Sequence, residues 1–377
     1  MAERGDLLQH GQIVAAGPIG ELRNSALMYE LHFGEKAAGG RLMATEGSTV
    51  HTRSFGRTGW QVSEIGFGSW GIGADWGAVD DRDALAALNE TLDRGVSFID
   101  TADVYGNGRA EKLIAQVLKS RNGKRPVVAT KAGRRLNPHV TAGYSRDNLT
   151  AFIERSLQYL EVDALDLVQL HCPPTEVYYR PETFEALDGL VTQGKIRHYG
   201  VSVEKVEEGI KALQYPGVAS VQIIFNMFRQ RPVELFFDLA KQRKVAVIVR
   251  VPLASGLLSG KFTRTSQFAS NDHRNYNRHG EAFDVGETFA GVPYEDGLAA
   301  VEEIRALVPA GETMAQFALR WILTHDAVSV VIPGAKNQRQ AQENAAASDL
   351  SPPSAQAMTQ ISAIYESRIK PFVHQRW

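Results

Sequence analysis

Cysteine is almost missing from this sequence, since Cys172 is the only one in 377 residues. A single thiol cannot close an internal disulfide, and such a composition is typical of a reducing compartment. Runs of about 18 apolar residues are also missing, so the sequence predicts no helix that spans a bilayer. Glu3, Asp6 and Gln9 stand where a secretory signal has a basic end and then an apolar core. We therefore expect a cytoplasmic protein.

The chain also lacks a large excess of charge of either sign. It has 41 Lys and Arg residues against 43 Asp and Glu residues, which gives a formal net charge of −2. Nucleic acids and membrane surfaces favour proteins with a clear basic excess, so we expect neither as the main partner. The ten histidines show no HxH or HExxH spacing, and no metal site is predicted. A small-molecule partner is favoured, and an oligomer stays open.

The chain does show a regular alternation of apolar runs and amphipathic helical stretches from residue 51 on. The eight expected strands are residues 63–69, 96–100, 126–131, 165–171, 196–202, 218–226, 245–252 and 328–333. Eight such units predict an α/β fold that closes into a (β/α)8 TIM barrel. An open dinucleotide-binding sheet would carry GxGxxG after its first strand. The segment GFGSWGIG at 66–73 has such glycines, but we expect no helix to open immediately after it and interpret it as a turn-forming loop.

Three segments fall outside this alternation. Residues 1–50 are expected to be an irregular extension with helical character only in 21–31, because so short a piece does not bury a core of its own. Residues 51–377 are expected to form the barrel domain. The long polar segment 254–294 follows the seventh strand and is expected to act as a lid. The tail, residues 350–377, is expected to fold over the barrel mouth.

Four side chains that can exchange protons lie at or just after the ends of three successive expected strands: Asp100, Tyr105, Lys131 and His171. The carboxyl ends of all strands in a parallel barrel meet at one mouth. Tyr105 is the expected general acid, with Lys131 lowering the pKa of its phenol and Asp100 pairing with Lys131. His171 would donate a hydrogen bond to a carbonyl oxygen. These four groups supply no electrons, so a hydride-carrying cofactor is implied.

Each of these residues has a structural alternative. A strand-end aspartate often caps a helix, a buried lysine often serves only as an ion-pair partner, and His171 could be a barrel-rim histidine with no reactive role. Three strand ends that all carry ionisable groups weaken these alternatives, because buried charge needs a partner. A nucleophilic Cys172 is disfavoured because no second histidine and asparagine arrangement accompanies it.

At this point the sequence resembles the aldo-keto reductase superfamily, of the bacterial type, from residue 51 to about residue 368. The motifs that carry the resemblance are FIDTADVYGNG (98–108), VVATKAG (127–133), LDLVQLH (165–171), IRHYGVS (196–202), VQIIFN (221–226), PLASGLLSGK (252–261) and VIPGAKNQRQAQEN (331–344). FGRTGWQVSEIGFG (55–68) resembles the hairpin that this family places over the bottom of its barrel. The resemblance implies a (β/α)8 barrel, reversible carbonyl reduction with a nicotinamide cofactor, and the same four catalytic residues.

The resemblance also implies where NADP(H) binds. Nicotinamide contacts fall at Ser202, Gln222 and Asn226, and pyrophosphate contacts at Leu253, Gly256 and Lys261. The adenosine end would lie against Gly334, Lys336, Gln340, Glu343 and Asn344. Lys336 near the 2′-phosphate favours NADPH over NADH, and Trp70 is expected on the substrate side.

Arg250 departs from the family pattern among the expected cofactor-binding residues. Many relatives have an aromatic ring at this position, and the ring stacks on the nicotinamide. A guanidinium plane can also stack, but its positive charge disfavours the positively charged oxidised ring.

The sequence thus predicts an NADPH-dependent oxidoreductase that reduces an aldehyde or ketone to an alcohol. The first alternative is a cofactor-binding regulatory subunit of the ion-channel-associated kind, which would share the barrel and the four residues but have little turnover. The second is a metal-assisted barrel hydrolase or isomerase. Turnover of a model aldehyde and metal analysis would separate the three.

Overall fold

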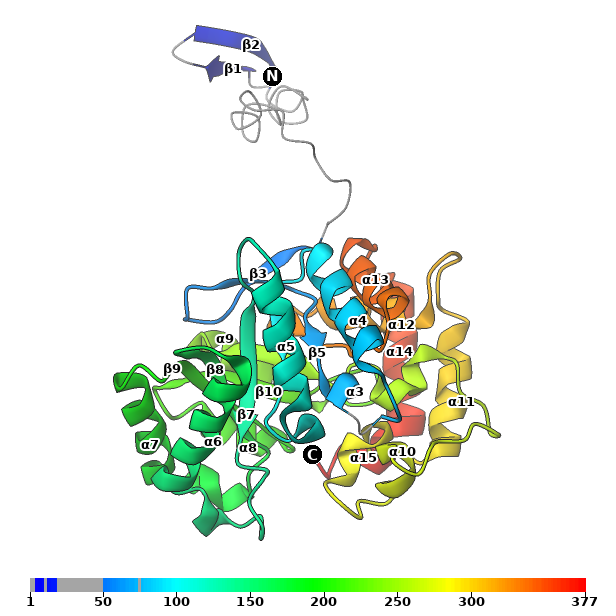
Figure 1. Cartoon of the computed structure of the whole chain (residues 1–377). Helices are drawn as coiled ribbons and strands as arrows, with labels where there is room; N and C mark the ends of the chain where they lie inside the picture. The colour runs from blue at the N-terminus through cyan, green and yellow to red at the C-terminus, as the bar shows by residue number, and fades with distance from the viewer. Residues whose placement is uncertain (1–3, 10–11, 19–49, 74–75) are drawn as a thin grey trace. The chain divides into compact units, whose positions relative to one another are not determined.

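The computed structural model describes residues 4–9, 12–18, 50–73 and 76–377 (Figure 1). The chain divides into two compact units, Met1–Gly47 and Ser48–Trp377. In the first unit, β1 (Arg4–Gln9) and β2 (Gln12–Pro18) pair as an antiparallel hairpin.

This hairpin corrects the expectation of an irregular extension for residues 4–9 and 12–18, while residues 19–49 lie outside the described part of the chain. Two short apolar runs, at 7–8 and 13–16, flank a glycine in the sequence, and this pattern is typical of a hairpin. The helical character expected for 21–31 lies outside the described residues.

The second unit is built on eight parallel strands. They are β5 (Phe67–Gly68), β6 (Phe98–Asp100), β7 (Val127–Ala132), β8 (Leu165–His171), β9 (Ile196–Ser202), β10 (Val218–Ile224), β11 (Ala246–Arg250) and β12 (Val328–Val331). Strands that are neighbours in the chain are neighbours in the sheet, and parallel bridges from Ile65 to Val331 and from Gly68 to Gly334 join the first strand to the last. The prediction of a (β/α)8 barrel is confirmed.

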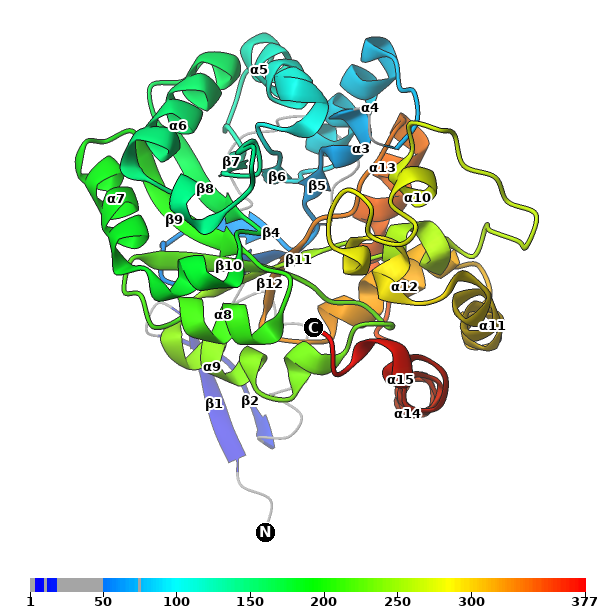
Figure 2. The ribbon, with the colours of Figure 1, turned by 90° about the horizontal axis from the view of Figure 1, so that it is seen from below.

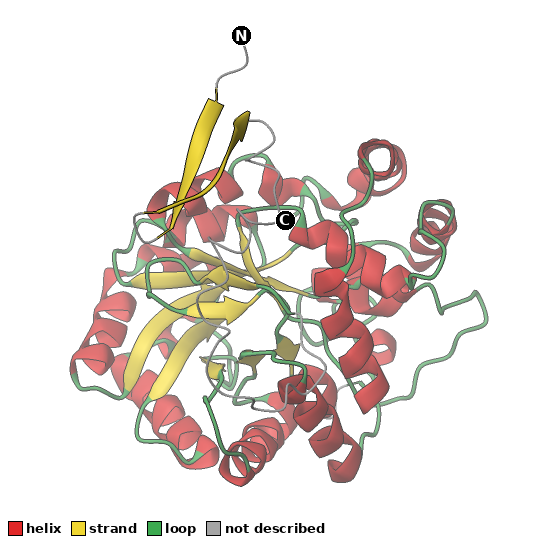
Figure 3. Ribbon diagram, turned by 90° about the horizontal axis from the view of Figure 1, so that it is seen from above, coloured by secondary structure: helices red, strands yellow, loops and turns green. Residues whose placement is uncertain are grey.

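Helices surround the strands on the outside (Figures 2 and 3). They are α4 (Asp81–Asp93), α5 (Arg109–Ser120), α6 (Arg146–Leu160), α7 (Pro181–Thr192), α8 (Val206–Ala212), α9 (Phe236–Arg243), α11 (Tyr294–Arg305), α12 (Met314–Leu323) and α13 (Gln338–Ala346). Several begin at a side-chain cap, as where Ser145 accepts the backbone N–H of Asn148 at 3.3 Å. No helix in the described residues is long and apolar enough to cross a membrane.

A short hairpin closes the amino end of the barrel. It consists of β3 (Thr52–Ser54) and β4 (Gln61–Ser63), which pair antiparallel. Phe55 is fully buried in its turn and stacks on Phe98 inside the barrel, with ring centroids 5.3 Å apart. The hairpin expected at 55–68 therefore exists, although it starts three residues earlier, and it leaves only the opposite end of the barrel open.

The first βα connection differs from the expected loop at 66–73. A one-turn helix, α3 (Trp70–Gly73), begins directly after β5, and its Ile72 N–H bonds to Ser69 O at 3.1 Å. The strand is shorter than the expected 63–69, because Ser63 belongs to the bottom hairpin and Ile65 makes only an isolated bridge to Val331. The result is that Trp70 stands at the carboxyl end of β5.

The long segment after β11 and the C-terminal tail pack against each other. The segment contains the short helices η5 (Ala254–Ser259), α10 (His273–Tyr276), η6 (Val285–Glu287) and η7 (Phe289–Gly291), and the tail contains α14 (Ala355–Ile364), η9 (Tyr365–Ile369) and α15 (Lys370–Val373). The indole Nε1 of the buried Trp377 donates to Asp284 Oδ1 at 2.8 Å. The tail thereby fixes part of the long segment.

Candidate active site

A cleft of about 370 Å³ opens at the carboxyl ends of the strands. Asp100, at the end of β6, and His171, at the end of β8, line it together with Tyr105, the first residue of η1 (Tyr105–Gly108). Lys131 in β7 is only 1% exposed and lies beneath them. The structure thus brings the four residues expected at successive strand ends to one place.

Lys131 connects Asp100 to Tyr105. Its ammonium Nζ lies 2.6 Å from Asp100 Oδ2 and 3.2 Å from the Tyr105 hydroxyl, and it donates to Thr101 O at 2.9 Å. The His171 ring lies edge-on to the Tyr105 ring, with centroids 5.9 Å apart. One phenol, one imidazole and one cation therefore converge on the same part of the cleft.

The second oxygen of Asp100 is held from the far side of the barrel. Gln222 Nε2 in β10 donates to Asp100 Oδ1 at 2.7 Å, and Gln169 Nε2 in β8 does so at 3.2 Å. Ser202 Oγ at the end of β9 donates to Gln222 Oε1 at 3.4 Å. These bonds are fully buried, and they fix the carboxylate that holds Lys131.

A left-handed turn places the Tyr105 side chain. Gly106 has a φ of 58°, and a Cβ there would lie 2.0 Å from the carbonyl oxygen of Gly73. Only glycine fits so close to another backbone segment. Arg135 secures the loop from the other side by donating to Asp103 O at 2.9 Å.

The electrostatics of Tyr105 differ from the sequence-based expectation. Burial raises the pKa of its phenol well above the ordinary value, and the charges of Asp100 and Glu287 raise it further. The expected lowering of this pKa by Lys131 does not prevail, because Asp100, 2.6 Å from the Lys131 ammonium, balances its charge and itself raises the pKa of the phenol. Tyr105 is therefore a neutral hydrogen-bond donor at physiological pH.

His171 is neutral as well. Burial lowers the pKa of its imidazole well below the ordinary value, and the charges of Arg134 and Lys131 lower it further. Its Nδ1 is buried without a hydrogen-bond partner. A neutral imidazole has one N–H to donate, so His171 can orient an oxygen in the cleft without bringing a charge to it.

The cleft continues from these residues to the start of α13. It is lined by fourteen of the seventeen residues expected in the site: Trp70, Asp100, Tyr105, His171, Gln222, Arg250, Leu253, Gly256, Lys261, Gly334, Lys336, Gln340, Glu343 and Asn344. Of the other three, Lys131 and Ser202 are buried behind the wall and bonded to residues that line it. Asn226 is likewise behind the wall, where its Nδ2 donates to Val251 O at 2.9 Å.

Lys336 reaches across the far part of the cleft. Its Nζ donates to the carbonyl oxygen of Trp76, in the connection after α3. Trp76 in turn makes an antiparallel bridge with Asp272 of the long segment. Burial lowers the pKa of Lys336, and the charge of Arg274 lowers it further.

Among the residues of the cleft wall that the sequence analysis missed are Trp76, Arg274 and Glu287. Arg274 is held by Asp272 at 2.6 Å and lies 4.9 Å above the Trp76 ring. Trp76 lies in a connection, and Arg274 and Glu287 lie in the short helices α10 and η6, where no strand end or long helical period marks a position that faces the barrel. The expectation that residues 254–294 cover the mouth was the available signal, but it did not distinguish Arg274 or Glu287 from their polar neighbours.

The aldo/keto reductase family profile matches residues 64–366 of this chain. Among curated relatives, the aldo-keto reductase YhdN of Bacillus subtilis is 30% identical over 293 residues, which cover 76% of this chain and 85% of the relative. The chain belongs to the aldo/keto reductase family. As a member of this family, it is an NAD(P)H-dependent oxidoreductase.

Two further comparisons extend the similarity. A probable voltage-gated potassium channel subunit beta of Arabidopsis thaliana is 29% identical, over 80% of this chain and 92% of its own length. The structure of an aldo/keto reductase from Klebsiella pneumoniae in complex with NADP and acetate matches with a TM-score of 0.62 and 25% identity, over 84% of this chain and 96% of its own. Both similarities extend over nearly the whole length of the related protein and over most of this chain.

In this aldo/keto reductase, the Arg250 guanidinium belongs to a buried charge cluster. It lies 2.8 Å from Glu204 Oε2 and 3.3 Å from Glu287 Oε2, while Arg134 bonds the other oxygens of both glutamates at 3.3 and 2.8 Å. Burial and the neighbouring Glu287 raise the pKa of Glu204 to about 8, whereas the two arginines hold the pKa of Glu287 far below its usual range.

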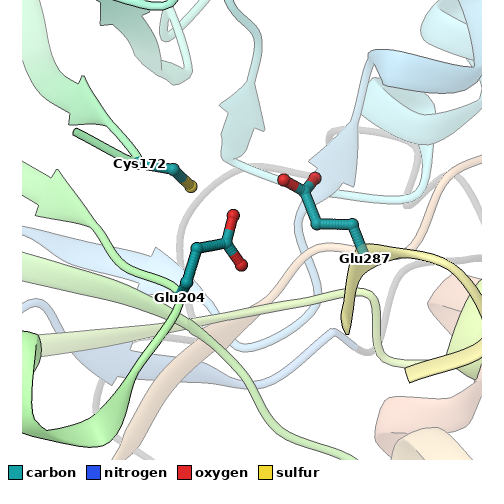
Figure 4. Close-up of side chains that lie close together, drawn as sticks. All are labelled: Cys172, Glu204 and Glu287. Carbon is teal, nitrogen blue, oxygen red and sulfur yellow. The ribbon is translucent and has the colours of Figure 1, made fainter. Parts of the chain in front are cut away.

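Cys172 completes this group. Figure 4 shows its thiol and the carboxylates of Glu204 and Glu287 pointing toward one another, and their ligand atoms lie within 4.8 Å. A metal ion would face the guanidinium groups of Arg134 and Arg250, which already occupy the carboxylate oxygens, so the cluster is unsuited to a cation. Burial also raises the pKa of the Cys172 thiol, which argues against a reactive thiolate.

Proposed function

We propose that this protein reduces an aldehyde or ketone to an alcohol with NADPH, and that Tyr105 is the general acid. The observation that carries the proposal is the placement of the Tyr105 hydroxyl in the cleft, 3.2 Å from the buried Lys131 ammonium and beside His171. The bound nicotinamide supplies the hydride. The residues of the chain then have to hold the carbonyl and deliver one proton to its oxygen.

The carbonyl oxygen is placed between the Tyr105 hydroxyl and the imidazole of His171, which both donate hydrogen bonds to it. Because its pKa is raised, the phenol keeps its proton until negative charge develops on the carbonyl oxygen. When the proton leaves, the ammonium of Lys131 stabilises the phenolate that remains. Asp100 keeps Lys131 in place and balances its charge before the reaction.

The cleft fits NADP(H) at both of its ends. Ser202 and Gln222 are neutral groups suited to the carboxamide of the nicotinamide. The amino end of α13 faces the cleft through Gln340, and unpaired backbone N–H groups at a helix start favour phosphate. Lys261 and Lys336 add positive charge along the wall, and we assign the 2′-phosphate to Lys336.

An aromatic wall covers the substrate side. The Trp70 ring lies nearly parallel to the Tyr105 ring, with centroids 6.0 Å apart, and meets Trp76 and Phe283 at 5.3 and 5.9 Å. Such a wall suits a carbonyl compound with an apolar substituent next to the reacting carbon. We further propose that the reaction takes place in the cytoplasm, since the single cysteine suits a reducing compartment.

A regulatory subunit with little turnover is the alternative, and the similarity to a potassium channel subunit beta favours it over other non-enzymatic roles. One experiment separates the two. The fall in NADPH absorbance is followed across a panel of aldehydes and ketones, while cofactor fluorescence reports binding. Binding with turnover supports the proposal, and tight binding without turnover of any carbonyl supports the alternative.

A further inference from the structure

The charge cluster of Arg134, Arg250, Glu204 and Glu287 lies against the reacting end of the cleft. Arg250 and Glu287 line the cleft together with Tyr105 and His171. The charges of Glu287, Arg134 and Arg250 also act on the Tyr105 phenol, the first raising its pKa and the other two lowering it. A charge carried by a group in this part of the cleft therefore interacts with the cluster.

NADP+ and NADPH differ in charge only at the nicotinamide, which is positive when oxidised and neutral when reduced. A carboxylate near the ring favours the oxidised form, and a guanidinium disfavours it. Arg250 alone would oppose the oxidised ring, but it is paired with two glutamates at 2.8 and 3.3 Å. The Arg250 Nε remains buried without a partner. The balance between the carboxylate and guanidinium charges of the cluster then decides whether the site prefers the oxidised or the reduced nicotinamide.

We propose that Glu204, Glu287 and Arg250 set the relative affinity of this site for oxidised and reduced nicotinamide, and that protonation of Glu204 adjusts it. This inference rests on the proposed use of NADP(H). Glu287 supplies a permanent negative charge in the cleft wall, and Arg250 supplies the opposing positive charge. Glu204, joined to both arginines behind the wall, adds a second negative charge only when it is ionised.

The direction of the pH dependence follows from the groups around Glu204. The titratable and charged groups that interact with the Glu204 carboxyl come from all the elements packed around it. They are Arg134, Cys172, Tyr178, Arg229, Arg250 and Glu287. The pKa of the Glu204 carboxyl is raised because burial and Glu287 oppose ionisation more than the arginines favour it, so we expect Glu204 to ionise within the range of the test below. Ionisation as the pH rises adds negative charge near the ring, so the affinity for NADP+ rises relative to that for NADPH.

The test measures dissociation constants of NADP+ and NADPH between pH 6 and pH 9, by fluorescence titration or calorimetry, without any carbonyl present. The ratio of the two constants is the informative quantity, because both cofactors carry the same 2′-phosphate and its own titration cancels. In the parent protein we expect the relative affinity for NADP+ to rise on the order of tenfold across this range.

Three variants separate a charge effect from a loss of structure. Glu287→Gln should lower the relative affinity for NADP+ on the order of tenfold, and Arg250→Gln should raise it. Glu204→Gln should remove most of the pH dependence. Glu185→Gln, on the exposed face of α7, is the matched control and should leave the ratio unchanged.

The outcomes are distinguishable. Opposite changes from Glu287→Gln and Arg250→Gln support the inference, since a loosened loop would weaken both cofactors together. Equal weakening of NADP+ and NADPH by each variant, or a parent ratio that stays constant with pH, overturns it while leaving the proposed function intact. If the parent binds neither cofactor, the proposed function itself fails.

Discussion

The two ends of the cleft are built differently. At the reacting end, Asp100 and Lys131 are almost fully buried, and each of their polar groups has a short hydrogen bond. At the adenosine end, Lys336 and Gln340 are half-exposed, and they bond mainly to the backbone or to each other. The first arrangement fixes reacting atoms before substrate arrives, whereas the second supplies charge and hydrogen bonds to whatever anion enters. Substitutions at the two ends should therefore affect different quantities.

The reacting end should show the largest effect. Tyr105→Phe removes the hydroxyl that we propose as the proton donor and leaves the ring in place. We expect the turnover rate with a model aldehyde to fall by about 10²–10⁴, the usual contribution of a placed general acid. The dissociation constant of NADPH should change little, because the phenol acts on the substrate oxygen.

Steady-state kinetics and a fluorescence titration on the same preparation measure both quantities. Tyr179→Phe is the matched control, since Tyr179 is 64% exposed on the protein surface. Near-normal turnover of the Tyr105 variant, or an equal loss from the control, would show that the proton comes from another group.

The sequence predicted that Asp100, Lys131 and His171 lie close together, because their positions follow from strand periodicity. A parallel barrel brings all carboxyl strand ends to one mouth, so Asp100, Lys131 and His171 meet wherever their strands end there. The pKa of Tyr105 was not predictable in the same way. It depends on burial and on Glu287, which lies more than 180 residues away in a connection without periodic pattern.

For Arg250, too, the sequence predicted the position of the residue but not its distant partners. The sequence showed that it ends a strand at the cleft and that its charge conflicts with an oxidised nicotinamide. It did not show that Glu204 and Glu287 contact the Arg250 guanidinium, because ion pairs across connections depend on how loops fold over the mouth. The sequence analysis thus predicted a positive charge at the cleft and missed the two glutamates that pair with it.

Two buried carboxylates close together in the sequence, Asp100 and Asp103, differ in how many hydrogen-bond partners they have. Asp103 is also fully buried, but it has one partner, Arg155, at 3.0 Å from Oδ2, and its Oδ1 has none. Burial and the nearby Glu111 raise the pKa of Asp103 to about 7, against the opposing effect of Arg155 and Arg135. This carboxyl is therefore costly to ionise.

The sign of the effect on stability follows from the raised pKa. Between its unfolded pKa near 3.9 and its folded pKa of about 7, the unfolded chain releases the proton of Asp103 first. The folded state accordingly loses stability as the pH rises through this window, by on the order of 4 kcal/mol for a shift of about three units. Asp103→Asn resembles the protonated form and should escape this loss.

Thermal unfolding of the parent and of Asp103→Asn between pH 4 and pH 8 measures the difference. We expect similar melting temperatures near pH 4, and an advantage for the variant that grows to several degrees by pH 7 and then stays constant. Asp163→Asn, at an exposed position before β8, should show no such trend. A difference that is the same at every pH would mean that Asp103 does not titrate in this window.

The adenosine end should give the smallest effect, on affinity alone. Lys336→Glu places a negative charge where we assign the 2′-phosphate of NADPH, while NADH offers only a hydroxyl there. A charge-assisted hydrogen bond to phosphate contributes about 1.5–3 kcal/mol, so NADPH should bind about tenfold more weakly or worse, and NADH should change far less. Arg339→Glu is the matched control, because it makes the same change of charge three residues further along the chain, at a side chain that is 84% exposed and pairs with Glu343. Fluorescence titrations of both cofactors decide between the two positions: equal weakening of NADPH and NADH by Lys336→Glu, or a larger effect from Arg339→Glu, would place the 2′-phosphate elsewhere.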